Sequence, residues 1–244
     1  MGDLFNLKET KLSDAERKAL ELFCWEVKEA IGENLLSVTL YGSAAGEEFS
    51  PGRSDINILL LTGTMEFQTL EKLLDPVSVG LRVSIHPMLL TEANLKSSTD
   101  IFPVKFYFMK KRYRVLYGKD LLHDLEILPE HLRLKSEQEI MNLLLRLRRH
   151  FVYHGGWRLA QKITSTITPF VENLRVAMSL GQEGIMGKDE AIEAAQAHGI
   201  SASAIRAAIG LKESGSSREE VEKIYADYME AVESAAKMVD ARHV

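Results

Sequence analysis

The sequence has very little cysteine and no long hydrophobic run. Its 244 residues include one cysteine, Cys24, so no disulfide can form within the chain and no cysteine-based zinc site can be built. No apolar stretch approaches the roughly 20 residues that a bilayer-spanning helix needs, and the acidic segment after Met1 does not resemble a secretory signal. We therefore expect a cytoplasmic protein with no membrane partner.

Positive charge is also scarce. The chain carries 30 Lys and Arg against 35 Asp and Glu, a formal net charge of -5, so the molecule as a whole does not attract nucleic acid or an anionic membrane. Any binding of a polyanion must come from a local patch. Hydrophobic residues make up 45% of the chain, enough for one large domain or two modest ones with their own cores.

The first half of the chain alternates helical and strand patterns. Ser13 and Glu16 have the spacing of a capping box at the start of a helix that ends near Ile31. Leu35–Tyr41 and Asp55–Thr62 are short apolar runs that predict strands. The second run is almost continuously apolar, which is typical of a strand buried on both faces.

Prolines limit the next elements. A helix over Glu66–Leu74 is expected to stop before Pro76. Leu81–Leu90 alternates well enough to predict a third strand, and Pro87 favours an edge position for it. Tyr113–Leu116 is expected to end this mixed region.

The second half of the chain has helical periodicity throughout. The predicted helices are Ser136–Phe151, Leu159–Leu180, Lys188–His198 and Arg218–Arg242, with Pro169 expected to kink the second or mark a boundary in it. We therefore predict an α+β fold. A mixed sheet with flanking helices occupies residues 1–125, and an all-helical bundle occupies residues 126–244.

Two short segments bring together residues that suit phosphate chemistry. Gly42 lets another group approach the backbone closely, and Ser43 offers a hydroxyl and an amide at a helical turn, which favour a phosphate. Side chains two residues apart on a strand share a face, so Asp55 and Asn57 should project together beside Ser43. With two acids there, a pair of Mg²⁺ ions could be held against a triphosphate.

These residues resemble the signature of the DNA polymerase beta-like nucleotidyltransferase superfamily, which is Gly-Ser, a short helix and loop, and then Asp-x-Asp or Asp-x-Glu on a strand. The matching segments are Tyr41-Gly42-Ser43, a loop with Gly46, and Ser54-Asp55-Ile56-Asn57. Val115–Lys119 resembles the segment that closes the catalytic domain in kanamycin and minimal nucleotidyltransferases, which carry a helical domain behind it. The resemblance implies a nucleoside triphosphate as ligand, bound by Gly42, Ser43 and Arg53, and a catalytic role for Asp55.

The sequence departs from this signature in its acidic residues. The second carboxylate of the family falls at Asn57, and the third, which comes from a neighbouring strand, lines up with Ser84. Asp55, Asn57 and Ser84 are thus the candidate metal ligands, with one carboxylate among them. Because neutral ligands bind Mg²⁺ more weakly than carboxylates, we expect weak Mg²⁺ binding and weakened or lost transfer to an acceptor that the sequence does not reveal.

Other residues could make up for the lost acids. Glu47, Glu48 and Glu92 are candidates by position, and a shift of the strand alignment by two residues would change the assignment. His86 shares a face with Ser84 if the third strand is regular, so an imidazole could ligate a metal or act as a base.

Two further segments leave other functions open. Lys105–Arg114 interleaves basic and aromatic residues, a pattern that suits nucleic acid, a nucleotide in a neighbouring cleft, or simply a helix with a buried aromatic face. Arg149 and His154 have the Arg-x4-His spacing of HEPN ribonuclease domains, which are often partners of minimal nucleotidyltransferases. The alternatives to a transferase are therefore a non-catalytic nucleotide-binding or regulatory protein and a ribonuclease or toxin–antitoxin component. The oligomeric state is left open.

Overall fold

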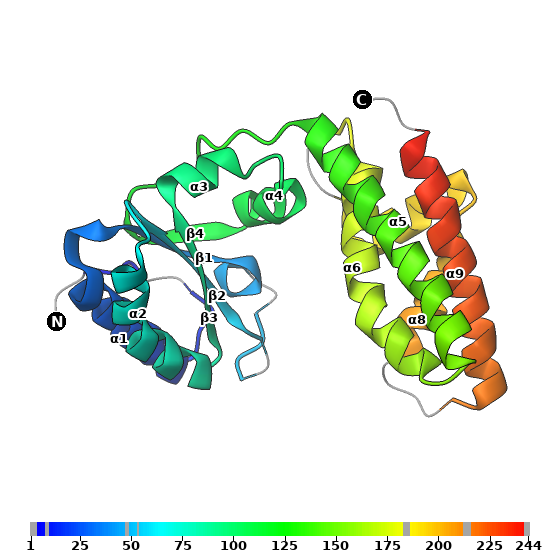
Figure 1. The fold of residues 1–244 in the computed structure, drawn as a ribbon, viewed down its shortest axis with the longest axis horizontal. Coiled ribbons are helices and arrows are strands. Elements are labelled where there is room, and N and C mark those ends of the chain that lie inside the picture. Colours follow the sequence, from blue (N-terminus) through cyan, green and yellow to red (C-terminus); the bar gives the residue numbers. More distant parts are fainter. Residues whose placement is uncertain are drawn as a thin grey trace. The chain divides into compact units, whose positions relative to one another are not determined.

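The chain forms two compact units, Met1–Ile127 and Leu128–Val244, in a computed structural model. The structure describes residues 4–7, 10–46, 49–52, 54–182, 186–211 and 216–241. The first unit contains a four-stranded sheet with helices, and the second contains helices (Figure 1). The predicted α+β fold class is confirmed.

The sheet of the first unit is mixed. Its strands are β1 (Leu35–Tyr41), β2 (Ile56–Thr62), β3 (Ile85–Thr91) and β4 (Tyr113–Gly118), in the order β3-β2-β1-β4. β1 is antiparallel to both β2 and β4, whereas β2 and β3 are parallel. The end of β1 therefore lies beside the starts of β2 and β4, and the start of β3 lies at the same edge. This one edge collects residues from four separate segments of the sequence.

Helices cover both faces of the sheet. α1 (Asp14–Ile31) and α2 (Phe67–Arg82) lie on one face, and α3 (Glu92–Ser97) and α4 (Pro103–Lys111) lie on the other (Figure 1). Alternate side chains of β2 serve the two sides, since Ile58 packs in the core with α1 and α2 while Leu59 packs in the core with α3 and α4. The expectation of a strand buried on both faces is confirmed.

The predicted capping box begins α1. The Ser13 hydroxyl oxygen accepts a hydrogen bond from the backbone N–H of Glu16 at 3.3 Å, and the Ser13 N–H donates to the Glu16 carboxylate at 2.8 Å. The helix ends at Ile31, and a short turn of 3-10 helix, η1 (Gly32–Asn34), leads into β1.

α2 corrects the prediction at Pro76. The helix runs through this proline to Arg82, although an interior proline costs about 3 kcal/mol. Leu73, Pro76 and Gly80 are all buried, and a Cβ on Gly80 would stand 2.8 Å from the ring of Phe23 on α1. Burying several apolar side chains contributes about 1.5–3 kcal/mol each, which offsets the proline. Because the helix is longer than expected, the third strand begins at Ile85 instead of Leu81. It is an edge strand, as Pro87 indicated.

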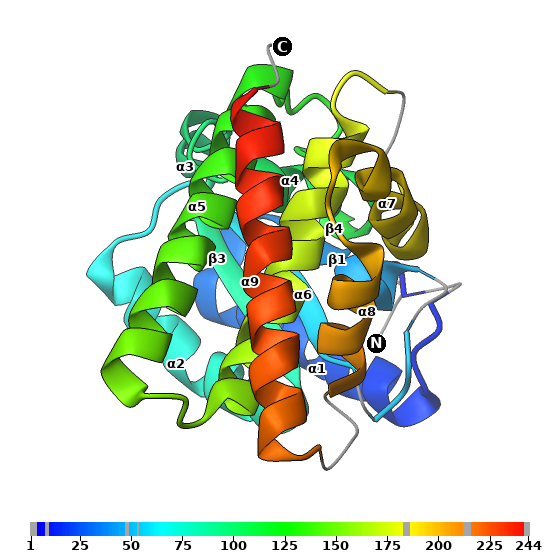
Figure 2. The ribbon, with the colours of Figure 1, turned by 90° about the vertical axis from the view of Figure 1, so that its right-hand side faces the viewer.

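The second unit is a helical bundle. Its elements are α5 (Pro129–His154), α6 (Leu159–Ser179), α7 (Lys188–Ala194), η3 (Ala195–His198), α8 (Ala202–Gly210) and α9 (Arg218–Asp240). The long helices α5, α6 and α9 run alongside one another (Figure 2). Pro169 lies inside α6 without ending it, and α8 was not expected from the sequence.

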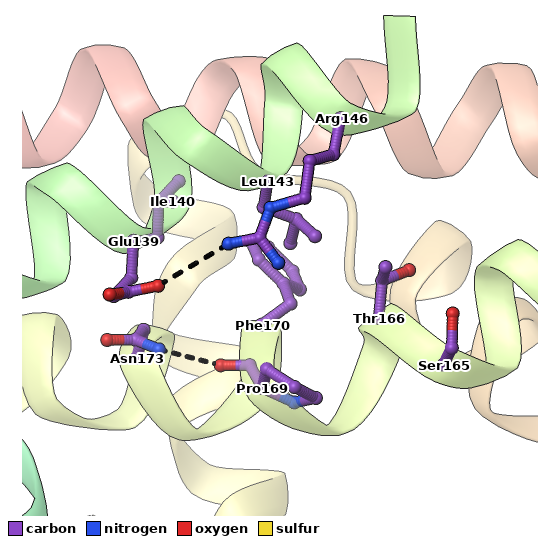
Figure 3. A pocket seen from close by; sticks show the side chains of 9 residues that line it. All are labelled: Glu139, Ile140, Leu143, Arg146, Ser165, Thr166, Pro169, Phe170 and Asn173. Atoms are coloured by element: carbon purple, nitrogen blue, oxygen red, sulfur yellow. Dashed lines mark hydrogen bonds and ion pairs between the residues drawn. The ribbon is translucent and has the colours of Figure 1, made fainter. Parts of the chain in front are cut away.

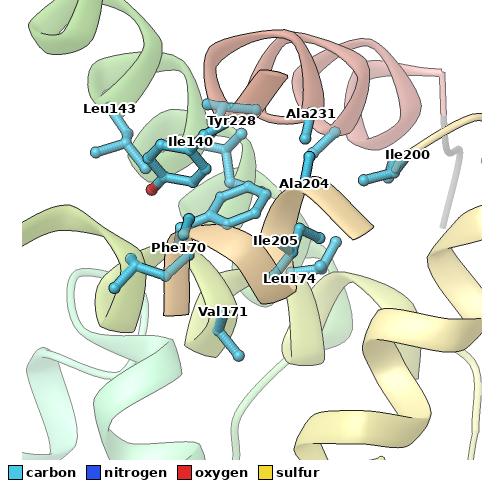
Figure 4. Packing of buried hydrophobic residues seen from close by; sticks show 14 of the residues in the cluster. Ile140, Leu143, Phe170, Val171, Leu174, Ile200, Ala204, Ile205, Tyr228 and Ala231 are labelled. Carbon is cyan, nitrogen blue, oxygen red and sulfur yellow. The ribbon is translucent and has the colours of Figure 1, made fainter. Parts of the chain in front are cut away.

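Aromatic side chains organise the core of this bundle. Phe170 of α6 and Tyr228 of α9 meet edge to face, with ring centroids 5.6 Å apart, among aliphatic residues of the neighbouring helices (Figure 4). The buried hydroxyl of Tyr225 donates to the backbone carbonyl of Leu147 at 2.6 Å and so joins α9 to α5. In the ranges that the structure describes, no helix has the length and apolar character needed to cross a bilayer.

Candidate functional site

The turn after β1 supplies the first part of the site. The predicted helical turn over Ala44–Ser50 is wrong in position, because a single turn of 3-10 helix, η2 (Gly42–Ala45), begins directly at the strand end. Gly42 has a φ of 75°, which favours glycine. Its N–H donates to the carbonyl of Arg112 at 3.1 Å, and the N–H of Gly46 donates to the carbonyl of Ser43 at 2.9 Å. Two of the backbone amides are therefore used within the turn, which leaves the half-buried Ser43 hydroxyl as the side-chain donor facing a ligand.

Asp55 and Asn57 come to the same edge. Asn57 stands opposite Tyr41 of β1, and its Nδ2 would lie 3.6 Å from a Cβ placed on Gly42. Asp55 lies just before β2 with 63% of its side chain exposed. The structure thus brings Gly42, Asn57 and Asp55 to one edge of the sheet, as the spacing predicted. Burial raises the pKa of the neighbouring Tyr41 phenol, so this ring stays neutral beside the turn.

His86 is the residue that β3 presents to this edge. In the parallel register it stands opposite Asn57, and its Nε2 lies 3.4 Å from Oδ1 of Asp55. Sequence reasoning named His86 only as an alternative to Ser84. The signal that could have selected it is the register, which follows once β3 is known to start at Ile85.

Ser84 lies in the turn before β3 and outside the strand. Its φ is 60°, its side chain is exposed, and its carbonyl accepts a hydrogen bond from the N–H of Ile56 at 2.8 Å. The strand position assumed for Ser84 is therefore wrong, because α2 extends further than expected. Its role as a metal ligand stays a prediction.

The remaining acidic and basic candidates fall elsewhere. Arg53, Glu47 and Glu48 lie outside the described residues. Glu92 follows the other end of β3, about 20 Å along the strand from the level of Asp55 at 3.3 Å per residue. Its carboxylate binds Lys96 at 2.7 Å. Glu92 therefore cannot replace a missing acid at this edge.

Arg112 is a site residue that sequence reasoning missed. Its side chain packs on Gly46, where a Cβ would stand 2.5 Å from Cδ of Arg112. The glycine thus makes room for an arginine beside the Gly42–Gly46 turn. A guanidinium is a strong phosphate donor, and the signal was hidden because Arg112 belongs to the basic and aromatic segment Lys105–Arg114.

The rest of that segment is used largely inside the first unit. Phe106 and Met109 of α4 are buried. The Lys110 ammonium donates to the carbonyl of Leu125 at 2.6 Å, and the Lys111 ammonium lies 5.4 Å from the centroid of the Tyr107 ring. This arrangement favours a helix with a buried apolar face over an extended nucleic-acid surface.

The donor set at the edge does not fit a pair of Mg²⁺ ions. Asp55 supplies one carboxylate, Asn57 a neutral amide and His86 an imidazole, whereas Mg²⁺ prefers charged oxygen ligands. Within the described parts of the chain, no group of three or more His, Cys, Asp or Glu side chains is placed to hold a metal ion.

The Arg-x4-His pair of the helical unit is split between faces of α5. Five residues along a helix correspond to a rotation of about 140°, so Arg149 and His154 do not share a face. The His154 ring lies against that of His150, with centroids 4.7 Å apart, and Nε2 of His150 is 3.1 Å from the carbonyl oxygen of Trp157. This geometry does not favour a shared ribonuclease site.

A small pocket lies between α5 and α6 (Figure 3). Glu139 and Arg146 form an ion pair at its rim, with 3.8 Å between Oε2 and Nη2, and the side-chain amide of Asn173 donates to the carbonyl of Pro169 at 2.9 Å. Ile140, Leu143 and Phe170 supply apolar lining. The polar groups are engaged mainly with one another, so the pocket has the character of a packing defect between helices.

Comparisons with known proteins support the fold. No protein-family model matches the sequence, and no curated protein matches it. Among solved structures, the chain is similar to a spectinomycin adenyltransferase from Enterococcus faecialis, whose structure was determined with ATP and spectinomycin. The match has a TM-score of 0.53 at 11% sequence identity and covers 86% of this chain and 98% of that one. The chain therefore has a nucleotidyltransferase-like fold.

Proposed function

We propose that the first unit binds a nucleoside triphosphate at the edge of the sheet formed by Gly42, Ser43 and Asp55, and that transfer of its nucleotidyl group to an acceptor is weakened or lost. The observation that carries the proposal is the composition of this edge. It keeps the Gly-Ser turn and one carboxylate, but has Asn57 and His86 where more negative charge would be needed. The fold similarity to an adenyltransferase solved with ATP supports the choice of ligand.

The weakness of transfer follows from charge. In-line attack on a phosphorus needs cations that neutralise the developing negative charge, and losing such stabilisation costs several kcal/mol. A loss of about 4 kcal/mol slows a reaction by about a thousandfold. Binding is less affected, because Ser43 and Arg112 can still contact phosphate oxygens without a metal.

Thermal-shift titration with ATP, with and without Mg²⁺, tests the binding part of the proposal. We expect ATP to raise the melting temperature in both conditions, since a ligand at 100 times its Kd stabilises by about 2.7 kcal/mol. Ser43→Ala should reduce the shift. Glu92→Ala is the matched control, because this residue lies at the opposite edge of the sheet. An ATP titration with no shift in either condition would remove the proposed ligand.

A second assay addresses transfer. Labelled ATP is incubated with Mg²⁺ and a panel of hydroxyl-bearing acceptors that includes spectinomycin, and incorporated label is counted. We expect little incorporation by the natural sequence. Efficient Mg²⁺-dependent transfer that disappears in Asp55→Ala would contradict the weakened site.

A non-catalytic nucleotide-binding or regulatory protein is the second candidate, and the same missing carboxylates favour it. Asn57→Asp separates the two. A gain of Mg²⁺-dependent transfer in this variant would identify a weakened enzyme, and an unchanged background would identify a binding protein. Binding of nucleic acid through α4 and RNA cleavage at His154 are less favoured, because Lys110 and Lys111 have partners inside the unit.

A further inference from the structure

We propose that Asp55, Asn57 and His86 hold one divalent transition-metal ion, in preference to Mg²⁺. The ion would lie at the edge where the nucleotide is proposed to bind, so this inference deepens the proposed function. Its test uses the metal alone, and it can therefore stand or fall separately from nucleotide binding.

The separation of the two charged ligands matches a shared ion. Nε2 of His86 lies 3.4 Å from Oδ1 of Asp55. Two ligand atoms that are each about 2.1 Å from a metal are about 3.0 Å apart at a right angle and about 3.4 Å apart at a tetrahedral angle. An ion could thus bind both side chains with little movement. Both are open to solvent, with 46% and 63% of their side chains exposed.

Asn57 completes the set by its place in the sheet. It stands directly opposite His86 on the neighbouring parallel strand and two residues after Asp55. Its side chain therefore shares their face, and its amide oxygen is the third donor. The open coordination positions point away from the strands, where phosphate oxygens of a nucleotide could fill them.

The chemistry of the donors sets the preference. Imidazole nitrogen suits Zn²⁺ and other transition metals, whereas Mg²⁺ takes oxygen ligands and releases its water reluctantly. Mn²⁺ accepts both the oxygen and the nitrogen donors of this set. One negative charge and an imidazole should therefore bind Mn²⁺ or Zn²⁺ at least ten times more tightly than Mg²⁺.

Titration of the full chain with MnCl₂ in the absence of nucleotide tests the proposal. After treatment with a chelator, free Mn²⁺ is followed by electron paramagnetic resonance, and ZnCl₂ and MgCl₂ are added as competitors. We expect one Mn²⁺ per chain, displaced by Zn²⁺ and only by a large excess of Mg²⁺. His86→Ala and Asp55→Ala should each weaken Mn²⁺ binding at least tenfold.

The control is His123→Ala. His123 is an exposed histidine of the same unit that contacts a carboxylate, Asp124, at 3.9 Å, so a nonspecific effect of removing such a pair would appear there too. His86→Glu is the converse variant, and it should shift the preference toward Mg²⁺.

Three results would overturn the site: no Mn²⁺ binding, equal binding of Mn²⁺ by the natural sequence and by His86→Ala, or Mg²⁺ binding as tight as that of Mn²⁺. Circular dichroism of each variant establishes that it folds, which the exposure of both side chains leads us to expect. A failed ATP titration alongside intact Mn²⁺ binding would refute the nucleotide ligand and leave the metal site in place.

Discussion

Replacing Gly118 with alanine should destabilise the first unit strongly. Gly118 ends β4 with a φ of 76°, and a Cβ there would stand 2.0 Å from the carbonyl oxygen of Leu36. Because this oxygen belongs to the backbone of the adjoining strand β1, the end of β4 must move away. The hydrogen bond from the N–H of Lys119 to the same oxygen, now 3.2 Å long, would then be lost.

The magnitude has three parts. A left-handed backbone costs alanine about 1–2 kcal/mol, overpacking adds about 1–3 kcal/mol, and a lost backbone hydrogen bond adds about 1 kcal/mol. We therefore expect Gly118→Ala to lower the free energy of unfolding by about 3–6 kcal/mol. Gly32→Ala is the matched control, because its φ is 55° but nothing lies within 4 Å of the added Cβ. It should cost only the backbone part.

Urea unfolding followed by tryptophan fluorescence measures the difference. The chain has two tryptophans. Replacing Trp157, which is 68% exposed in the helical unit, with phenylalanine leaves Trp25 of α1 as the reporter of the first unit. If Gly118→Ala cost no more than Gly32→Ala in this background, the close approach of β4 to β1 would be refuted.

Three other predictions follow from buried or capped groups. Burial raises the pKa of the Cys24 thiol, so iodoacetamide should label it only after unfolding, as mass spectrometry can detect. Tyr225→Phe removes a buried hydrogen bond and should cost about 1 kcal/mol in urea unfolding; in the natural sequence, burial raises the pKa of Tyr225 to about 12, so its ultraviolet titration should come late. Burial raises the pKa of Glu16, but hydrogen bonds from Ser13 and Gly52 outweigh it and leave the pKa below 4.5. The resulting stabilisation should be present above pH 4.5 and lost as the pH falls through the lower folded pKa, and Glu16→Gln should remove this acid dependence in unfolding curves.

Local patterns predicted the elements whose signals lie within them. The capping box of Ser13 and Glu16 and the apolar run Leu35–Tyr41 correspond to observed elements, because hydrogen bonding over three residues and strand burial are visible in a short window. The end of α2 was mispredicted at Pro76. The packing that offsets this proline involves Phe23 of another helix, which no local window contains.

The candidate site divides in the same way. Gly42, Asp55 and Asn57 could be found from spacing alone, since they flank two strands that are evident in the sequence. His86 and Arg112 could not, because their positions depend on the register of β3 and on the packing of a side chain against Gly46. A site built from strand pairs is only as predictable as its registers.

The contact between Gly80 and Phe23 has a consequence for the chemistry at the other end of the loop it precedes. Gly80 lies in the last turns of α2, just before β3. Shifting a strand by one residue turns every side chain to the opposite face, so a larger residue at Gly80 that pushed the chain forward by one position would turn His86 toward the helices and Ile85 toward Asp55. Which donor the protein offers to a ligand is thus determined partly by a missing methyl group between two helices, on the far face of the sheet.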